Sequence, residues 1–475
     1  MRGVRWALGL FFSVAVLYAG CGLFPAYTAR NQTADVAPGR EPPKPVIAAS
    51  GAFGNVTLPR DVFLGIAISG GGSRAANFGI AALRELSGLG LLQRAAALSS
   101  VSGGSLAAAY YAQYRPNDDQ SWEMAGKVLR TNFFRAWAWH LLLPQNLALM
   151  AFTDFDRSDV MADIFDSTVF HGATFGNLAR DAPRLFINAT GADRQQFLFS
   201  EESFDSLGSR LDTYRLADAV MASGAFPLAF NNVTLAVFQK PGERQPATKA
   251  IQYRHLFDGG AADNLGIETL SGLLENVVAS AHERGAQLPR CMFVLIDADR
   301  SSDPDGDDPT WYERDTRGIF GRIADGNVFT SIDAMFAHRR AGQLEDLRPT
   351  NGHRFPGLPT WRHRFVVDVD GTTQDEVMCF VWHVHFARLK TLAKTDDPRV
   401  RQFREATWRV AQGAQTHYKL TGLGISAEAI QKALFDAAHI LVREDDEALV
   451  ALRAAGLFDP ERLTLVPEGQ RRACP

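Results

Sequence analysis

Short apolar runs recur along the chain, separated by longer segments with helical spacing of apolar residues. Residues 62–68, 97–101 and 291–297 are runs of mostly apolar or small residues, as is typical of strands covered on both faces. Between the first two runs, apolar residues within 75–86 recur on one helical face. This order of strand, helix and strand predicts an α/β fold with a mainly parallel central sheet.

The same patterning continues to the C-terminus. Further strands are predicted at 184–190, 196–199, 253–257, 365–369 and 377–386, and further helices at 214–223, 266–285, 318–344, 399–418 and 427–441. Two glycine-rich turns lie at strand ends, after residues 68 and 101. Since adjacent parallel strands end at one edge of a sheet, we expect both turns to face one pocket.

The N-terminus resembles a bacterial lipoprotein signal. Arg2 and Arg5 precede an apolar stretch of about a dozen residues, which is short of the roughly 20 needed to span a bilayer. Small residues then precede Cys21, although Tyr18 stands where leucine is usual. We expect cleavage before Cys21 and its lipidation; the alternative is a plain signal peptide or uncleaved anchor. The predicted location is the bacterial cell envelope, with the protein held on a membrane surface.

Composition and segment character suggest a division of the chain. The 475 residues are 46% hydrophobic with a net charge of −4, which is ordinary globular composition and gives no reason to expect nucleic acid binding. We predict a signal peptide at 1–20, a Pro-rich tether at 21–55, a core domain at 56–300 and a C-terminal extension at 301–475, partly packed on the core.

The first glycine-rich turn is Ser69-Gly70-Gly71-Gly72-Ser73-Arg74. Successive glycines let backbone N–H groups point toward one spot, and at a helix N-terminus such a nest binds negative charge. The turn lacks the residues of a nucleotide-binding loop. It is interpreted as an oxyanion hole or a structural tight turn, with Arg74 ordering the loop.

The second turn places a serine between a strand and a helix. Ser100-Val101-Ser102-Gly103-Gly104 is close to the G-x-S-x-G pattern, with Ser100 in place of the first glycine. Ser102 is therefore a candidate nucleophile, and the Gly103 amide a candidate oxyanion donor.

A carboxylate stands at a similar position. Asp258 ends a predicted strand and precedes Gly259 and Gly260, so it could accept the serine proton as general base. Alternatively, Asp258 or Asp263 caps the next helix.

Together, these three motifs resemble the patatin-like phospholipase family, in the same order and with 156 residues between serine and aspartate (258 − 102). The short block 222–227 resembles another family element, and the resemblance covers roughly 61–297. It implies a three-layer α/β/α sandwich and a Ser102–Asp258 dyad acting on ester-linked acyl chains of membrane lipids. The oxyanion would be held by Gly70, Gly71, Gly72 and Gly103, with Gly259 and Gly260 supporting the aspartate turn, and no cofactor is implied.

Two other functions stay open from the sequence. A Ser-His-Asp esterase would need a late histidine such as His383 or His417. A non-catalytic lipid-binding lipoprotein could keep the same fold. His383 and His385 alternate on a predicted strand but lack a third ligand, so no metal site is predicted. Protein partners cannot be assigned.

Two features of the sequence have more than one interpretation. Cys291 and Cys379 lie in apolar runs and are expected to be small buried hydrophobes; the pattern does not predict a disulfide framework. Residues 133–144 contain two Phe, two Trp and three Leu. They form either a buried helix pair or a surface helix that contacts lipid or lines an acyl channel.

Overall fold

The computed structural model describes residues 29–33, 62–179, 183–238, 252–299, 327–348, 359–369, 373–414, 418–421, 424–456 and 471–472. The predicted signal peptide, Cys21, most of the tether and His417 lie outside these residues. Within the described part of the chain, no helix combines the length and the apolar character needed to cross a bilayer.

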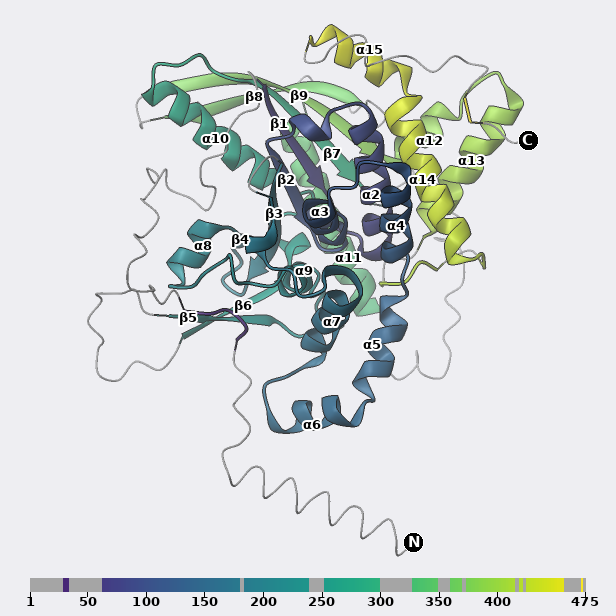
Figure 1. The fold of residues 1–475 in the computed structure, drawn as a ribbon. Helices are drawn as coiled ribbons and strands as arrows, with labels where there is room; N and C mark the ends of the chain where they lie inside the picture. The colour runs from purple at the N-terminus through teal and green to yellow at the C-terminus, as the bar shows by residue number, and fades with distance from the viewer. Residues whose placement is uncertain are drawn as a thin grey trace, which may run out of the picture.

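A mostly parallel sheet forms the centre of the protein (Figure 1). Its order is β5-β6-β3-β2-β1-β7-β9-β8, with β4 paired to β3. The strands are β1 Val62–Ile68, β2 Ala97–Val101, β3 Arg184–Gly191, β4 Gln196–Phe199, β5 Val233–Val237, β6 Gln252–Asp258, β7 Arg290–Asp297, β8 Thr360–Asp368 and β9 Gln374–His385. The five strands from β3 to β9 in this order are parallel, whereas β4, β5, β6 and β8 pair antiparallel. The predicted mainly parallel sheet is confirmed.

Helices cover both faces of the sheet, as predicted. One face packs on α2 (Gly72–Gly88), α3 (Gly103–Tyr114), α9 (Leu216–Ser223) and α14 (Ala427–Arg443). The other face packs on α10 (Ile267–Glu283), and the last turns of α11 (Asn327–Leu347) join that second core.

The remaining helices lie around this sandwich. They are α4 Asp119–Leu129, α5 Phe133–Leu141, α6 Pro144–Phe152, α7 Arg157–Phe165, α8 Glu201–Ser206, α12 Phe386–Leu392, α13 Pro398–Gly413 and α15 Asp446–Ala454. In α2 the side chains of Ile80, Leu83 and Leu86 are fully buried, which is the apolar face expected from their spacing.

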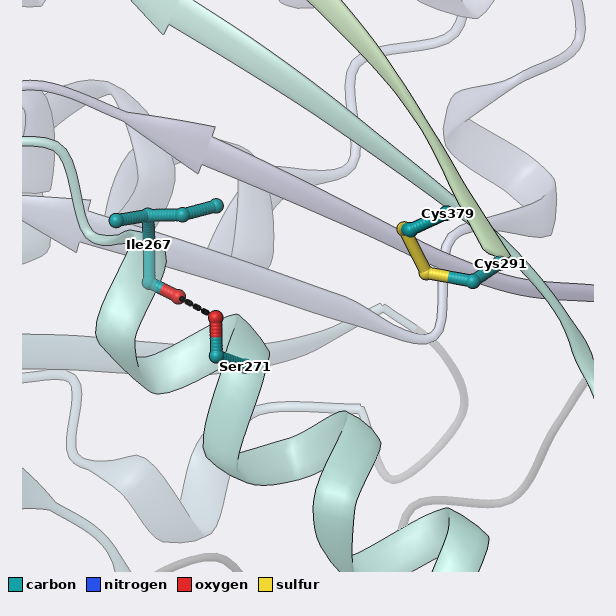
Figure 2. Close-up of a disulfide and its surroundings, with 4 residues drawn as sticks. All are labelled: Ile267, Ser271, Cys291 and Cys379. Carbon is teal, nitrogen blue, oxygen red and sulfur yellow. Dashed lines mark hydrogen bonds between the residues drawn. A yellow bond between two sulfur atoms is a disulfide. The ribbon is translucent and has the colours of Figure 1, made fainter. Parts of the chain in front are cut away.

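The sheet continues across residue 300. β9 pairs with β7 over seven residues, so part of the predicted C-terminal extension is built into the central sheet. This register places Cys291 opposite Cys379, and the two form a disulfide (Figure 2). Both cysteines are buried as expected. Their bond was not expected, because only the pairing of two strands 88 residues apart brings them together.

The two histidines of β9 belong to a buried ionic cluster. His383 Nε2 lies 2.8 Å from Asp297 Oδ2, and the Arg340 guanidinium donates to both oxygens of the same carboxylate. Burial opposes ionisation of Asp297, but Arg340 and His383 hold its pKa well below the usual range. His383 therefore has a carboxylate partner within the core, and its ring stacks on that of His385.

We predict that these histidines make stability depend on pH. Burial and the neighbouring His383 hold the pKa of His385 well below its usual range, and burial also lowers the pKa of His383. Both rings are thus neutral in the folded protein at pH values where the unfolded chain takes up protons. The contribution of these histidines to the free energy of unfolding is therefore greatest above about pH 6.5, and it decreases as the pH drops below that value.

Urea unfolding between pH 7.5 and 5 tests this, with pH values chosen to bracket the ordinary histidine pKa of about 6.5. His385→Leu should flatten the decline toward low pH, because a neutral side chain replaces one that must be protonated on unfolding. The exposed His171→Asn serves as control and should keep the wild-type slope. Parallel curves for wild type and His385→Leu would contradict the assignment.

Candidate active site

Ser102 occupies a tight turn between β2 and α3. Its backbone has φ 50° and ψ −125°, a region that non-glycine residues rarely adopt and that costs about 1–3 kcal/mol. Ser223 supports this conformation, because its Oγ accepts the Ser102 N–H at 2.8 Å and donates to the Asn188 carbonyl at 2.5 Å. The turn thus holds the Ser102 side chain at the carboxyl end of the parallel strands.

The structure brings Ser102 and Asp258 together. Ser102 Oγ donates to Asp258 Oδ2 at 2.8 Å, and the second oxygen, Oδ1, accepts the Gly260 N–H at 2.9 Å. Both residues are buried, with 8% of Ser102 and 2% of Asp258 exposed. The carboxylate is therefore oriented by its own turn and directed at the serine hydroxyl.

Asp258 reaches this edge of the sheet from the opposite direction to Ser102. The sequence placed both residues at strand ends, as if on similar strands. β6 instead runs antiparallel to β3, and its final residue Asp258 lies opposite Ala189. The neighbouring Asn188 lies opposite Val101, which precedes the serine. Ser102 and Asp258 therefore meet because of the register of β3 with its two neighbours, and not because their strands are parallel.

The glycine-rich turn lies beside Ser102. Gly71 and Gly72 have φ values of 136° and 53°, which only glycine adopts readily. Among the described residues, no acceptor takes the N–H of Gly71, Gly72 or Gly103. These amides lie at the N-termini of α2 and α3, where a developing negative charge is stabilised.

Gly70 has a different role from the one expected. Its N–H donates to the Asn264 carbonyl at 3.0 Å, so this amide is not available to an oxyanion. A Cβ on Gly70 would lie 2.5 Å from Asn264 Oδ1 and 3.5 Å from the Ser102 Cβ. Gly70 therefore provides space at the junction of the glycine-rich turn, the serine turn and the loop after Asp258.

Arg74 connects the glycine-rich turn to two distant parts of the chain. Its buried guanidinium donates to the Ala298 carbonyl at 2.6 Å and to the Ala414 carbonyl at 3.0 Å. The first contact ties the start of α2 to the end of β7. The second ties it to the end of α13, in the C-terminal part of the chain.

Residues after Asp258 hold the aspartate turn. A Cβ on Gly259 would lie 2.4 Å from the Asn188 carbonyl oxygen, so a glycine is required there. Asp263, rather than Asp258, caps α10, because its carboxylate accepts four backbone N–H groups from Leu265 to Glu268. Burial, and then the charge of Glu268, raise the pKa of Asp263 to about 6.

Helix α11 packs over this turn, a contact that sequence reasoning did not predict. Arg339 Nε donates to the Ala262 carbonyl at 2.8 Å, and Gln343 Nε2 donates to Asp263 Oδ1 at 2.9 Å. The Phe336 ring lies close to Gly260. No motif marks these residues, because their role depends on a helix that packs from more than 70 residues away.

Tyr418 is a second site residue that the sequence did not indicate. Its hydroxyl donates to the Gly224 carbonyl at 3.0 Å and lies near enough to Ser102 and Asp258 to interact with both. Burial and, secondarily, the Asp258 carboxylate raise its pKa, so the phenol stays protonated. Gly224 belongs to the small-residue block 222–227, and a Cβ there would lie 1.9 Å from the Tyr418 hydroxyl.

This arrangement can support acyl transfer. It combines a hydroxyl on a strained turn, a carboxylate in hydrogen-bond contact and amide donors at two helix N-termini. His383, one histidine considered for a triad, is bound to Asp297 inside the core. The other, His417, lies outside the described residues.

Gly103 provides a test of how closely the two turns must approach. A Cβ at this position would lie 2.1 Å from the Gly72 carbonyl oxygen, a backbone atom that cannot rotate away. We expect Gly103→Ala to lower the free energy of unfolding by about 1–3 kcal/mol, measured by urea denaturation.

The matched control is Gly342→Ala in α11, where an added Cβ meets nothing within 4 Å. It should leave stability unchanged or raise it by up to about 1 kcal/mol. Equal stability of Gly103→Ala and wild type would show that the turns do not approach as described.

Comparison with known proteins identifies one family over part of the chain. The sequence model of the patatin-like phospholipase family matches residues 66–271, a range that contains the glycine-rich turn, Ser102 and Asp258. No curated protein sequence matches the chain significantly.

Two solved structures match this chain at low sequence identity and low TM-score. Human GIVD cytosolic phospholipase A2, in complex with methyl gamma-linolenyl fluorophosphonate and terbium chloride, is 16% identical, with a TM-score of 0.44 over 83% of this chain. This chain covers 59% of that enzyme's length. VipD from Legionella pneumophila is 12% identical, with a TM-score of 0.30, and the match covers 81% of this chain and 67% of VipD. On the family match, the chain contains a patatin-like phospholipase domain at residues 66–271.

Proposed function

We propose that this protein is a lipid acyl hydrolase that cleaves ester-linked acyl chains of phospholipids through a Ser102–Asp258 dyad. The observation that carries the proposal is the 2.8 Å hydrogen bond from Ser102 Oγ to Asp258 Oδ2 on the strained turn. The presence of a domain from a phospholipase family supports the substrate class.

The proposed reaction uses these groups in turn. Ser102 Oγ attacks the ester carbonyl carbon while Asp258 accepts the hydroxyl proton. The resulting oxyanion is stabilised by N–H groups of Gly71, Gly72 and Gly103. The carbonyl re-forms, the alkoxide leaves with the proton held by Asp258, and an acyl-enzyme remains. Water, deprotonated by Asp258, then attacks this ester, and the proton returns to Ser102 as the fatty acid departs.

The proposal includes attachment to a membrane surface of the bacterial cell envelope through an acylated Cys21. The sequence before Cys21 supports this, since a basic start, a short apolar stretch and two small residues precede it. A covalently attached acyl chain would keep the domain beside its substrate.

Substitution of the dyad tests the proposed chemistry. Fatty acid release from phospholipid vesicles should fall by roughly 10³-fold or more in Ser102→Ala and by about 10²–10⁴-fold in Asp258→Asn. Fluorophosphonate should label the wild type and fail to label Ser102→Ala. Ser271→Ala is the matched control, because its hydroxyl only donates to the Ile267 carbonyl within α10 (Figure 2).

The same experiment separates the competing functions. Loss of activity in His417→Ala with little effect of Asp258→Asn would favour a Ser-His-Asp esterase. Activity that survives Ser102→Ala would exclude both mechanisms. A wild type that neither releases fatty acid nor reacts with fluorophosphonate would favour a non-catalytic lipid-binding protein.

A further inference from the structure

Helices α5 and α6 form a projection from the body of the protein (Figure 1). We refer to residues 133–152 as the α5–α6 hairpin. α5 buries only Phe133, and α6 buries no residue. The alternative that this segment forms a buried helix pair is therefore wrong.

The hairpin exposes an unusual share of large apolar side chains. Fourteen such side chains are exposed among the described residues, and five of them belong to these 20 positions: Phe134, Trp139, Leu142, Leu147 and Phe152. Trp139 is 64% and Leu142 67% exposed, at the end of α5 and the turn that follows. Apolar surface concentrated in this way indicates an interaction site.

Charge distinguishes between the partners that could bind the exposed surface of the hairpin. The α5–α6 hairpin contains Arg135 but no Asp or Glu, in a chain with 53 acidic residues. Lys419 adds a further cation over the Phe134 ring. A second copy of the chain docked through the same surface would bring these cations together. Anionic lipid headgroups would instead be attracted to them, and Trp and Phe favour the bilayer interface.

The base of the hairpin contacts the candidate active site. The Phe134 N–H donates to the Tyr418 carbonyl at 3.2 Å, and the Tyr418 side chain lies beside Ser102 and Asp258. The Trp137 ring packs on Phe230, which packs on Tyr418. Packed aromatic rings thus connect the hairpin with the residues around Ser102.

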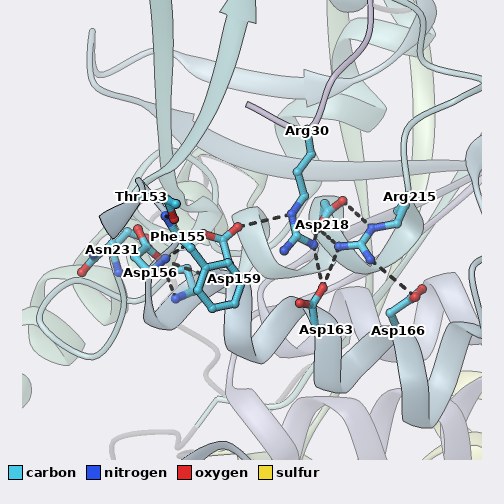
Figure 3. A network of polar contacts seen from close by, with 11 residues as sticks. Arg30, Thr153, Phe155, Asp156, Asp159, Asp163, Asp166, Arg215, Asp218 and Asn231 are labelled. Atoms are coloured by element: carbon cyan, nitrogen blue, oxygen red, sulfur yellow. Dashed lines mark hydrogen bonds and ion pairs between the residues drawn. The ribbon is translucent and has the colours of Figure 1, made fainter. Parts of the chain in front are cut away.

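The N-terminal segment attaches near the same helices. Arg30 forms ion pairs with Asp159 and Asp163 of α7 and with Asp218 of α9 (Figure 3). α7 in turn packs on α5, since the Phe165 and Phe133 rings lie 5.3 Å apart. Cys21 precedes Ala29 by only eight residues, which span at most about 28 Å.

We propose that the α5–α6 hairpin docks on the surface of a bilayer that contains anionic lipid, with Trp139, Leu142 and Leu147 inserted at the interface. The inference rests on the proposed function only for the identity of the substrate, because docking can be measured in a chain that cannot hydrolyse lipid.

A fluorescent label tests insertion directly. The full chain carries Cys21→Ser and Cys474→Ser to remove other reactive thiols, Ser102→Ala to prevent turnover, and Leu142→Cys for an environment-sensitive NBD label. On vesicles of phosphatidylcholine with phosphatidylglycerol, we expect a blue shift and an intensity rise of about twofold or more. The matched control label at Met378→Cys, on a side chain 52% exposed in β9, should not respond.

The enzymatically active chain provides the second measurement. Trp139→Ser with Leu142→Ser, in the Cys21→Ser background, should lower affinity for these vesicles roughly tenfold or more. Hydrolysis of a water-soluble short-chain ester should stay at the rate of its parent. If the Cys21→Ser parent does not hydrolyse the soluble ester, the proposed function is refuted. The docking result would still stand, because it is measured without turnover.

Three outcomes would overturn the docking proposal. The first is a label at position 142 that does not respond when the chain sediments with vesicles. The second is a chain that does not sediment with them. The third is a response without lipid that rises with protein concentration and accompanies a dimer in sedimentation velocity, which would identify a second copy as the occupant.

Discussion

The hydrogen bond between Ser102 and Asp258 requires two turns, 156 residues apart in sequence, to meet at one edge of the sheet. β3 makes this possible, because it pairs parallel with β2 on one side and antiparallel with β6 on the other. Asn188 and Ala189 are adjacent on β3, so the strand partners of Val101 and Asp258 are neighbours. The contact between Ser102 and Asp258 therefore depends on the register of β3, a strand that contributes neither residue.

Close backbone approach holds the rest of the site. Gly103 lies against the Gly72 carbonyl, and a Cβ on Gly104 would lie 2.5 Å from the Ser69 carbonyl oxygen. These contacts pack the start of α3 against the glycine-rich turn, and they bring the amides of two helix N-termini to one place. Side chains larger than hydrogen would separate the turns and move the donors away from Ser102.

The elements that sequence reasoning predicted correctly are those specified by local pattern. Continuous apolar runs identified β1, β2 and β7. The glycines beside Ser102 and Asp258 identified turns in which there is no room for a larger side chain. Other features depend on pairing between distant segments. They are the antiparallel direction of β6, the Cys291–Cys379 disulfide and the hydrogen bond from the Gly70 N–H to the Asn264 carbonyl. Tyr418 and α11 could not be assigned for the same reason, since their roles exist only after the C-terminal region packs on the aspartate turn.

Under the proposed function, this packing connects the candidate site to the bilayer that holds its substrate. Transfer of an acyl chain from a bilayer into water costs about 0.8 kcal/mol per methylene, so hydrolysis of a membrane lipid requires apolar surface near the nucleophile. The ring contacts from Trp137 through Phe230 to Tyr418 connect the α5–α6 hairpin with the apolar residues beside Ser102. Tyr418 belongs to the region beyond the family match, and Phe230 to the region within it. The apolar connection is therefore assembled from both parts of the chain, and residues 66–271 alone would lack one side of it.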